Sequence, residues 1–426
     1  MTTSPIPFSS SPPAVAWIGL FRAEDQPVAK EMLDEMLLVS RDSFAQEMRE
    51  LVLHRKLDGS GPIGLYAERE LPKRFGRPHP LFKQSRTKVK RAFGVGPQPV
   101  CPTRAYDPEV GSEGLVAQLI TELCREFPKD FLNHPSPDAI RKQKVRRFIL
   151  VTDFIGSGQR AWTYLEAAWR VKSVASWNSL RKGGQKLIRF EVVAYSSTPA
   201  GQKRVEKHPC TPAVHVVKAC PTIDTVFTSD DIRQQVRSLC IRYDPVDHDL
   251  TESLGYKGSG ALIAFAHGAP NNSPRVLHKR SRHWTPLFPA RVTAGTNAHF
   301  VKEEDADAIA KRLERMRQRR LAAGNWLNEA NEEVRSLILV LAFLGRGPRG
   351  DEAVSCKTGL TVLEVRRMVS NAFNLGWIDK QRHLTDYGQA ELALARKNKT
   401  KKTPLSVEPE EPYYPTSLRA PRRVSS

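Results

Sequence analysis

Short apolar runs alternate with amphipathic helical segments along this chain, and few folds accommodate that alternation. The apolar runs have the length of strands, and they are IGLYAE (63–68), RRFILVTDF (146–154), LIRFEVVAYS (187–196), AVHVVKA (213–219) and ALIAFAHG (261–268). The helical segments cover residues 112–127, 158–171, 198–207 and 229–243. Strands that alternate with helices predict a parallel sheet with helices on both faces. We therefore expect an α/β fold.

One of these strands ends in a glycine-bearing turn, VTDFIGSG (151–158). Ligands bind beyond the carboxyl ends of strands in open parallel sheets, and Asp153 is near such an end. Gly156 and Gly158 permit a tight turn, and the helix after Ser157 directs its N-terminal dipole at the same place. Such amides, with a hydroxyl, favour a phosphate monoester, and a carboxylate beside them suits ribose hydroxyls. The alternative is an ordinary strand-to-helix turn, because GxG alone is a weak signal.

Residues 333–397 have the element order of a winged helix-turn-helix. Three helical segments (334–345, 351–359 and 361–378) precede WIDKQRHLT (377–385), which predicts two short strands around a basic tip, and a last helix follows. In this small α+β fold the third helix enters the major groove and the wing contacts the backbone. The side chains expected to contact nucleic acid are Arg366, Arg367, Asn371, Lys380 and Arg382. The alternative is a module for protein docking or dimerisation.

The other segments complete the predicted organisation of the chain. We expect disorder over the Ser/Pro-rich residues 1–16 and over the polar tail, residues 398–426. The remaining assignments are an N-terminal helical segment (17–62, helical over 27–54), an α/β domain (63–295) with a long basic surface loop (72–108), and a charged helical connector (300–332).

Charge and cysteine content restrict the partners and the compartment. The 66 Lys and Arg residues exceed the 46 Asp and Glu residues and give a net charge of +20, which favours nucleic acid before membrane as a partner. The six cysteines form no CxxC pair, which favours reduced thiols in a cytoplasmic protein. No apolar stretch is long enough to span a membrane and the N-terminus lacks the features of a signal peptide. The His and Cys spacings match no metal template, so we expect no metal held by protein ligands alone.

The turn VTDFIGSG resembles the phosphoribosyl pyrophosphate loop of type I phosphoribosyltransferases. The resemblance implies that Thr152 and Asp153 occupy the two positions that bind the ribose hydroxyls. The residues that it implies for the 5′-phosphate are Gly156, Ser157, Gly158 and Gln159. The sequence departs from the family at Thr152, where an acid is usual, and at Gln159, which replaces a small residue. The loss of a carboxylate at Thr152 puts turnover in doubt.

Three further stretches resemble a bacterial subfamily of phosphoribosyltransferase-like proteins found with defence systems. They are the N-terminal WIGLF…EMLDEMLLVSRDSF, VGSEGLVAQLI (110–120) and GYKGSGALIAFAHGAPNNSP (255–274). The resemblance suits Gly111, Ser112 and Glu113 to a place near the pyrophosphate or its magnesium, and Asn271 and Asn272 to the base pocket. The alternative for both asparagines is a capping or turn role. We interpret His267, at the end of an apolar strand, as a packed histidine rather than a base.

The resemblance implies an effector of a retron-type anti-phage system. Its expected ligand is phosphoribosyl pyrophosphate with Mg²⁺, and its expected partners are DNA or an RNA–DNA hybrid and a retron reverse transcriptase. The implied reaction is that of a glycosyltransferase, displacement at the ribose C1′ with Asp153 orienting the ribose, or hydrolysis of an N-glycosidic bond. Two alternatives stay open: a non-catalytic sensor of phosphoribosyl pyrophosphate or a nucleotide that regulates DNA binding, which Thr152 favours, and a structural partner with a vestigial pocket.

Overall fold

The computed structural model of the 426-residue chain describes residues 8–58, 61–97, 112–182, 185–186, 188–246, 252–289, 300 and 306–397. Contacts divide the chain into two compact units. The first comprises residues 1–303 with 348–367, and the second comprises residues 304–347 with 368–426.

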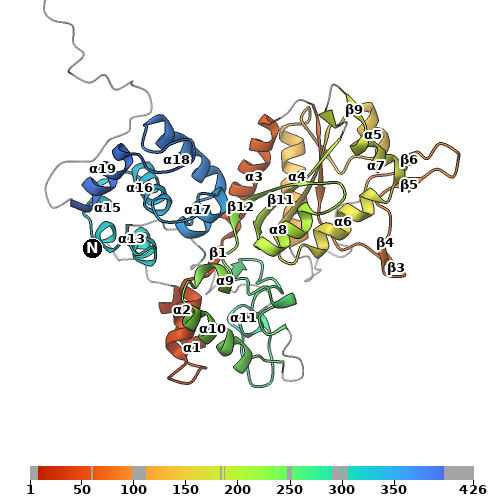
Figure 1. Cartoon of the computed structure of the whole chain (residues 1–426). Coiled ribbons are helices and arrows are strands. Elements are labelled where there is room, and N and C mark those ends of the chain that lie inside the picture. The colour runs from red at the N-terminus through yellow and green to blue at the C-terminus, as the bar shows by residue number, and fades with distance from the viewer. Residues whose placement is uncertain are drawn as a thin grey trace, which may run out of the picture. The chain divides into compact units, whose positions relative to one another are not determined.

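A five-stranded parallel sheet forms the centre of the first unit (Figure 1). Its strands, in spatial order, are β12 (Ala213–Ala219), β11 (Arg189–Ser197), β8 (Arg147–Ile155), β2 (Ile63–Ala67) and β7 (Phe131–Asn133). Every neighbouring pair is parallel. The central strand β8 is buried from Arg147 to Thr152, which explains its almost uninterrupted apolar sequence. The prediction of a parallel sheet in an α/β fold is confirmed.

Helices cover both faces of this sheet. One face carries α5 (Pro137–Lys142), α6 (Gln159–Trp169), α7 (Lys172–Ser179) and α8 (Pro199–Glu206), and the other carries α3 (Arg41–Leu57) and α4 (Ser112–Glu126). Successive residues of β8 point to opposite faces: Leu150 packs with Tyr164 of α6, whereas Val151 packs with Met48 of α3 and Leu119 of α4. The period-two arrangement of β8 therefore divides the core into two layers.

A second core packs around a separate two-stranded parallel ladder. Strand β1 (Leu37–Val39) pairs with β13 (Ile263–Phe265). The surrounding elements are η1 (Phe8–Ser10), α1 (Pro12–Ile18), α2 (Gln26–Asp34), α9 (Ile223–Val226), α10 (Asp230–Arg242) and α11 (Arg275–His278). The short helix η3 (Tyr256–Gly258) precedes β13. Trp17, Phe21 and Trp284 form its aromatic centre. The apolar run 261–268 thus belongs to this ladder and not to the main sheet.

Two predictions for the N-terminal region are wrong. Residues 8–16 are ordered, because the Ser11 side chain caps α1 and Ala14 is fully buried in the second core. The helix predicted over residues 27–54 is two helices, because residues 37–39 pair with β13 and Ser40 caps α3 through Ser43.

Two further segments differ from the predictions. The described part of the predicted loop over 72–108 contains two antiparallel hairpins, β3 (Lys73–Arg74) with β4 (Arg77–Pro78) and β5 (Lys83–Gln84) with β6 (Ala92–Phe93). The segment predicted as a charged helical connector contains three helices, α13 (Ala306–Arg315), α14 (Arg319–Ala322) and α15 (Trp326–Glu329). The break after α13 coincides with Arg317, whose φ is 58°. A further small hairpin, β9 (Arg181–Lys182) with β10 (Gln185–Lys186), follows α7.

The C-terminal elements follow the order of a winged helix. They are α16 (Glu332–Leu344), α17 (Asp351–Thr358), α18 (Val362–Asn374) and α19 (Asp386–Lys397). Gly359 ends α17 in the left-handed region, at φ 75°. The two short strands predicted for the wing reduce to one antiparallel bridge between Ile378 and Leu384. Among the described helices, none is long and apolar enough to cross a membrane.

Candidate functional site

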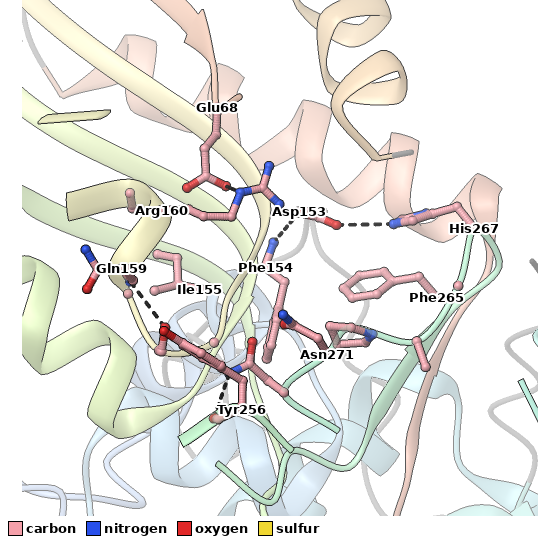
Figure 2. A pocket seen from close by; sticks show the side chains of 18 residues that line it. Glu68, Asp153, Phe154, Ile155, Gln159, Arg160, Tyr256, Phe265, His267 and Asn271 are labelled. Atoms are coloured by element: carbon pink, nitrogen blue, oxygen red, sulfur yellow. Dashed lines mark hydrogen bonds and ion pairs between the residues drawn. The ribbon is translucent and has the colours of Figure 1, made fainter. Parts of the chain in front are cut away.

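A cavity of about 420 Å³ opens at the carboxyl ends of β2 and β8. Its walls are residues 153–161, Glu68, Tyr256 and residues 265 and 267–272 (Figure 2). Residues from the main sheet therefore face residues from the second core across the cavity. Open parallel sheets bind ligands at this edge, and a cavity of this size accommodates a small phosphorylated molecule.

The glycine turn, residues 156–158, is in close contact with Asn272, Thr198 and Gly201. A Cβ atom on Gly156 would lie 1.9 Å from Oδ1 of Asn272, so no other residue fits there without movement. The Thr198 hydroxyl donates a hydrogen bond of 2.6 Å to the carbonyl oxygen of Gly156. Gly158 has a φ of 70°, and a Cβ there would lie 2.6 Å from the carbonyl oxygen of Gly201. Both glycines of the turn are therefore required by the geometry.

Helix α6 begins directly at the cavity. Its N-cap residue is Gly158, which offers no side chain to the first amides of the helix. Ser157 lines the cavity, and its Oγ lies 3.4 Å from the Gln159 amide nitrogen. The 11 residues of α6 give the positive end of a helix dipole at this wall. This wall has the chemistry of an anion site.

Two carboxylates come from neighbouring strands at the same edge. Asp153 follows the buried part of β8, accepts a hydrogen bond of 2.8 Å from the Phe154 amide and lies 3.3 Å from Nε2 of His267. Glu68 follows β2 directly, and its amide donates to the carbonyl oxygen of Val151. The Thr152 hydroxyl donates a hydrogen bond of 2.6 Å to Oε2 of Glu68. Thr152, at the position where the resemblance implies an acid, thus orients an acid from the neighbouring strand.

Burial sets the ionisation of Glu68. Its side chain is 4% exposed, and this burial, with the charge of Asp153, raises its pKa to about 7. The guanidinium of Arg160 and the hydrogen bond from Thr152 oppose that rise. Protonated and ionised forms of Glu68 therefore coexist near neutral pH. A carboxyl with such a perturbed pKa, lining a cavity, is typical of a functional site.

Arg160 connects this acid pair to helix α4. Its Nη2 donates a hydrogen bond of 2.5 Å to Oε1 of Glu113, and its Nε lies 3.8 Å from Oε2 of Glu68. Glu113 was predicted near the pyrophosphate, and it contacts Arg160, which lines the cavity. Gly111 lies outside the described residues, as does the side chain of Ser112, the first residue of α4.

The opposite wall contains the two predicted asparagines and His267. Asn271 is exposed at the cavity, whereas Asn272 is buried and its Nδ2 donates to Ser259 Oγ at 2.7 Å. Asn272 therefore has the turn-stabilising contacts that were the alternative for it, and it also lines the cavity. His267 packs flat on Phe265 at 4.8 Å between ring centroids, as predicted for a packed histidine, yet its Nε2 faces Asp153 (Figure 2).

The residues predicted to contact nucleic acid differ in their surroundings. Arg367 and Lys380 are exposed, on α18 and in the wing. Nε of Arg366 donates to Oδ2 of Asp351 at 2.7 Å, and Nδ2 of Asn371 donates to Oε1 of Glu333 at 3.1 Å. Arg382 is half-buried with a φ of 63°.

Sequence reasoning missed Glu68 and Arg160. Glu68 had a usable signal, because it directly follows an apolar run as Asp153 does, and the carboxyl ends of neighbouring parallel strands meet at one edge. The neighbour relation of β2 and β8 was not readable from the chain order, since 79 residues separate the end of β2 from the start of β8. Arg160 carried no signal beyond its place in the first turn of a helix.

The fold and the cavity define an α/β protein with a cavity at the carboxyl edge of a parallel sheet. A family described as PRTase-CE, in which PRTase denotes phosphoribosyltransferase, matches residues 15–290, and the chain belongs to this family. A family described as wHTH-PRTase associated matches residues 338–420. The chain therefore combines a phosphoribosyltransferase-like domain with a C-terminal winged helix. No curated protein and no solved structure matches it.

Proposed function

We propose that this chain is a phosphoribosyltransferase-like effector of a bacterial anti-phage system of the retron type. It binds a phosphoribosyl compound through residues 152–159 and nucleic acid through its winged helix. The defence setting rests on the sequence resemblance of residues 110–120 and 255–274. The observation that carries ligand binding is the cavity that joins an anion-binding turn to two carboxylates.

The 5′-phosphate binds at the glycine turn. The backbone there accepts a hydrogen bond from Thr198 and lies close against Asn272, so its amides are already arranged before the ligand arrives. The N-terminus of α6 adds its dipole, and Ser157 adds a hydroxyl. Preorganised donors of this kind cost no reorganisation on binding.

The ribose binds between Asp153 and Glu68. Ionised carboxylates only accept hydrogen bonds, so they suit the two vicinal hydroxyls of a ribose. The contact from Thr152 places Glu68 beside the loop, where it supplies the second acid that the loop itself lacks. In this proposal Glu68, which follows strand β2, supplies the carboxylate that is absent at Thr152.

The reaction is displacement at the ribose C1′. In transfer, the bond from C1′ to the pyrophosphate oxygen breaks with its electron pair, a base nitrogen bonds to C1′, and the proton of that nitrogen leaves to solvent. In the hydrolytic alternative, the bond from C1′ to a base nitrogen breaks with its electron pair, a water oxygen bonds to C1′, and the proton that the water loses is balanced by protonation of the departing base. Asp153 orients the ribose, and the amides of 156–159 hold the phosphate while positive charge develops at C1′. Mg²⁺ bound to the pyrophosphate would neutralise the leaving group, and the carboxylate oxygens of Glu68 and Asp153 are of the type that this ion prefers.

A second candidate is a non-catalytic sensor that regulates DNA binding. The observation in its favour is the Thr152 hydroxyl, which donates to Glu68 at the position where the resemblance expects an acid. A pocket that lacks this acid in the loop suits binding without turnover. Such a protein binds phosphoribosyl pyrophosphate or a nucleotide without releasing pyrophosphate.

Nucleic acid binds at the winged helix, through Arg367 on α18 and Lys380 in the wing. Both cations are exposed, whereas Arg366 and Asn371 already have partners in the protein. The third helix and the wing are the elements by which such domains contact the groove and the backbone. The proposed partner is the RNA–DNA product of a retron reverse transcriptase, bound alone or with that enzyme.

One experiment separates the two candidates. The full chain is incubated with phosphoribosyl pyrophosphate, Mg²⁺ and a panel of bases, nucleotides and NAD, with and without nucleic acid. Release of pyrophosphate or of a free base that is lost in Asp153→Asn supports the enzyme. An increase in Tm without release supports the sensor, and at a ligand concentration of 100 Kd it corresponds to about 2.7 kcal/mol.

The matched control is Glu70→Gln, which removes an exposed carboxylate two residues from Glu68. We expect it to leave binding and release unchanged. If the wild-type chain shows neither release nor an increase in Tm with any ligand of the panel, the phosphoribosyl site is refuted.

A further inference from the structure

Two antiparallel hairpins project from the first unit between β2 and α4, and Figure 1 shows them extending beyond the helices. They carry eight cations, all exposed: Lys73, Arg74, Arg77, Lys83, Arg86, Lys88, Lys90 and Arg91. The sequence from Lys73 to Arg91 contains no Asp or Glu. We call these eight residues together with Phe75 the hairpin surface.

The roots of both hairpins are fixed in the protein core. Phe82 and Ala92 are buried among residues of the main sheet and of α6. The hydrogen bonds at the roots join Leu81 N to Ala167 O (2.8 Å), Arg170 Nη1 to Pro78 O (2.8 Å), Lys172 N to Gln84 Oε1 (2.7 Å) and Ala92 N to Ser173 Oγ (2.8 Å). The tip of the second hairpin is ordered by its own contacts, in which Thr87 Oγ1 donates to Val89 O and Arg91 N donates to Ser85 Oγ. The cations therefore project from a rigid base.

The described residues place few carboxylates near the charges of the hairpin surface. Among the described residues, Arg91 is the one member with a carboxylate within 4 Å, and its partner Asp138 is 3.8 Å away. Arg74 and Arg77 face each other as paired residues of β3 and β4. Like charges directly opposite on an antiparallel pair destabilise it. An external anion would relieve this repulsion, since no carboxylate of the described residues lies within 4 Å of Arg74 or Arg77.

Phe75 at the tip of the first hairpin has no packing role. Its side chain is 91% exposed, and its backbone has a φ of 50°, a region that bulky side chains rarely adopt. Gly76 follows with a φ of 73°. Both turn residues therefore have a positive φ, which glycine adopts readily and phenylalanine does not. The Arg74 guanidinium lies 5.6 Å from the ring centroid. The two-residue turn between β3 and β4 needs a positive φ at both central residues, which Asn or Gly usually provides. An exposed phenylalanine at this position, in place of one of these residues, points to a function of its ring.

We propose that the hairpin surface is a binding site for single-stranded nucleic acid. The cations contact phosphates, and Phe75 stacks on an unpaired base. Proteins commonly bind single strands through basic surfaces with exposed aromatic side chains. An unpaired base offers a free face for stacking on an aromatic ring, whereas the bases of a duplex are stacked on one another. The site rests on neither the phosphoribosyl cavity nor the winged helix, so it stands or falls independently of the proposed function.

The test compares two variants of the full chain with equal changes in charge. The hairpin variant carries Arg74→Gln, Arg77→Gln, Lys88→Gln and Lys90→Gln. The control variant carries Lys30→Gln, Lys129→Gln, Lys203→Gln and Lys207→Gln, which are exposed elsewhere in the first unit. Fluorescence anisotropy with a labelled 20-nucleotide single strand, a duplex of the same sequence and phosphatidylserine vesicles is measured from about 50 to 300 mM salt.

We expect the hairpin variant to lose at least about 10-fold in affinity for the single strand, with a salt slope smaller by up to about 3, since each lost phosphate contact removes about 0.7. The control variant keeps the wild-type slope.

Phe75→Ser, which leaves the charge unchanged, lowers single-strand affinity roughly 10-fold and leaves duplex affinity unchanged. Each loss persists in a chain that also carries Arg367→Ala and Lys380→Ala in the winged helix.

Three results would overturn the proposal. Equal losses in the hairpin and control variants would show that only net charge matters. A loss confined to the duplex would contradict recognition of unpaired bases. A loss confined to vesicles would assign the surface to an anionic membrane. Because all substituted side chains are exposed, unchanged circular dichroism and Tm are expected and show that the variants fold.

Discussion

Glu68→Gln should stabilise the ligand-free protein above neutral pH and weaken the binding of a phosphoribosyl ligand. The side chain of Glu68 is buried at the cavity edge, where Oε2 accepts from Thr152. Burial, the main cause, raises its pKa from 4.5 to about 7. A neutral glutamine has the same shape and avoids the cost of burying a charge. A residue kept at such a cost is typical of a binding site.

The magnitude and its pH window follow from this pKa. A rise from 4.5 to about 7 corresponds to about 3 kcal/mol, at roughly 1.4 kcal/mol for each pH unit. Because the folded state holds the proton more tightly than the unfolded state, the stability of the wild type relative to the variant is highest below pH 4.5. It is lost as the pH rises through the window from 4.5 to about 7. Between pH 4 and pH 8, the free energy of unfolding of the variant therefore rises by about 3 kcal/mol relative to that of the wild type.

The assay is urea unfolding of both proteins without ligand at intervals of half a pH unit from 4 to 8. Glu70→Gln serves as the control, since Glu70 is exposed, and we expect its difference from the wild type to stay constant across the range. A difference between wild type and Glu68→Gln that does not change with pH would refute the reasoning, because it would mean that Glu68 ionises like a surface carboxyl.

Three further outcomes follow from the structure. Gly156→Ala should abolish phosphoribosyl binding and cost about 1–3 kcal/mol in unfolding free energy, because its Cβ would overlap Asn272; calorimetric titration and urea unfolding measure both effects. Arg147→Met should cost about 3 kcal/mol in urea unfolding, because Arg147 forms two hydrogen bonds of 2.6 and 2.8 Å to the buried carboxylate of Glu191. Arg367→Ala should reduce the salt slope of duplex binding by about 1, through the loss of one phosphate contact.

Each of these outcomes has a control. A Cβ on Gly350 meets no atom within 4 Å, so Gly350→Ala should leave binding intact, and equal loss in both glycine variants would contradict the packing argument. Arg49 pairs with Glu126 on the exposed surface, so Arg49→Met should cost less than about 1 kcal/mol. Arg366 already pairs with Asp351, so an Arg366→Ala variant that changes the salt slope as much as Arg367→Ala would contradict the assignment on α18.

The parallel sheet was predictable because its strands are buried on both faces and read as apolar runs. The spacing and burial of apolar residues indicate a strand but not the sheet to which it belongs. The run 261–268 therefore did not indicate that β13 pairs with β1 outside the main sheet. The strand at 37–39 was hidden between two helices, because three residues are too few to interrupt a helical pattern. The hairpins at 73–93 were missed because their strands have two residues each and little apolar content.

The turn at 156–158 was predictable because glycines often mark positions where the backbone admits no side chain. In the structure, a Cβ on Gly156 would overlap Asn272, and Gly158 has a positive φ. The partners of that turn were not predictable, since Thr198 and Asn272 reach it from distant parts of the chain. Glu68 follows an apolar run, but its place beside Asp153 was not predictable for the same reason. The site depends on which strands are neighbours, and that is a property of the sheet rather than of any local segment.

The most direct test of the phosphoribosyl site is a crystal structure of the chain with phosphoribosyl pyrophosphate and Mg²⁺. The account predicts the 5′-phosphate within hydrogen-bond distance of the amides of residues 156–159, with the ribose hydroxyls at Asp153 and Glu68. A ligand bound elsewhere, or a ribose held without contact to either carboxylate, would contradict it.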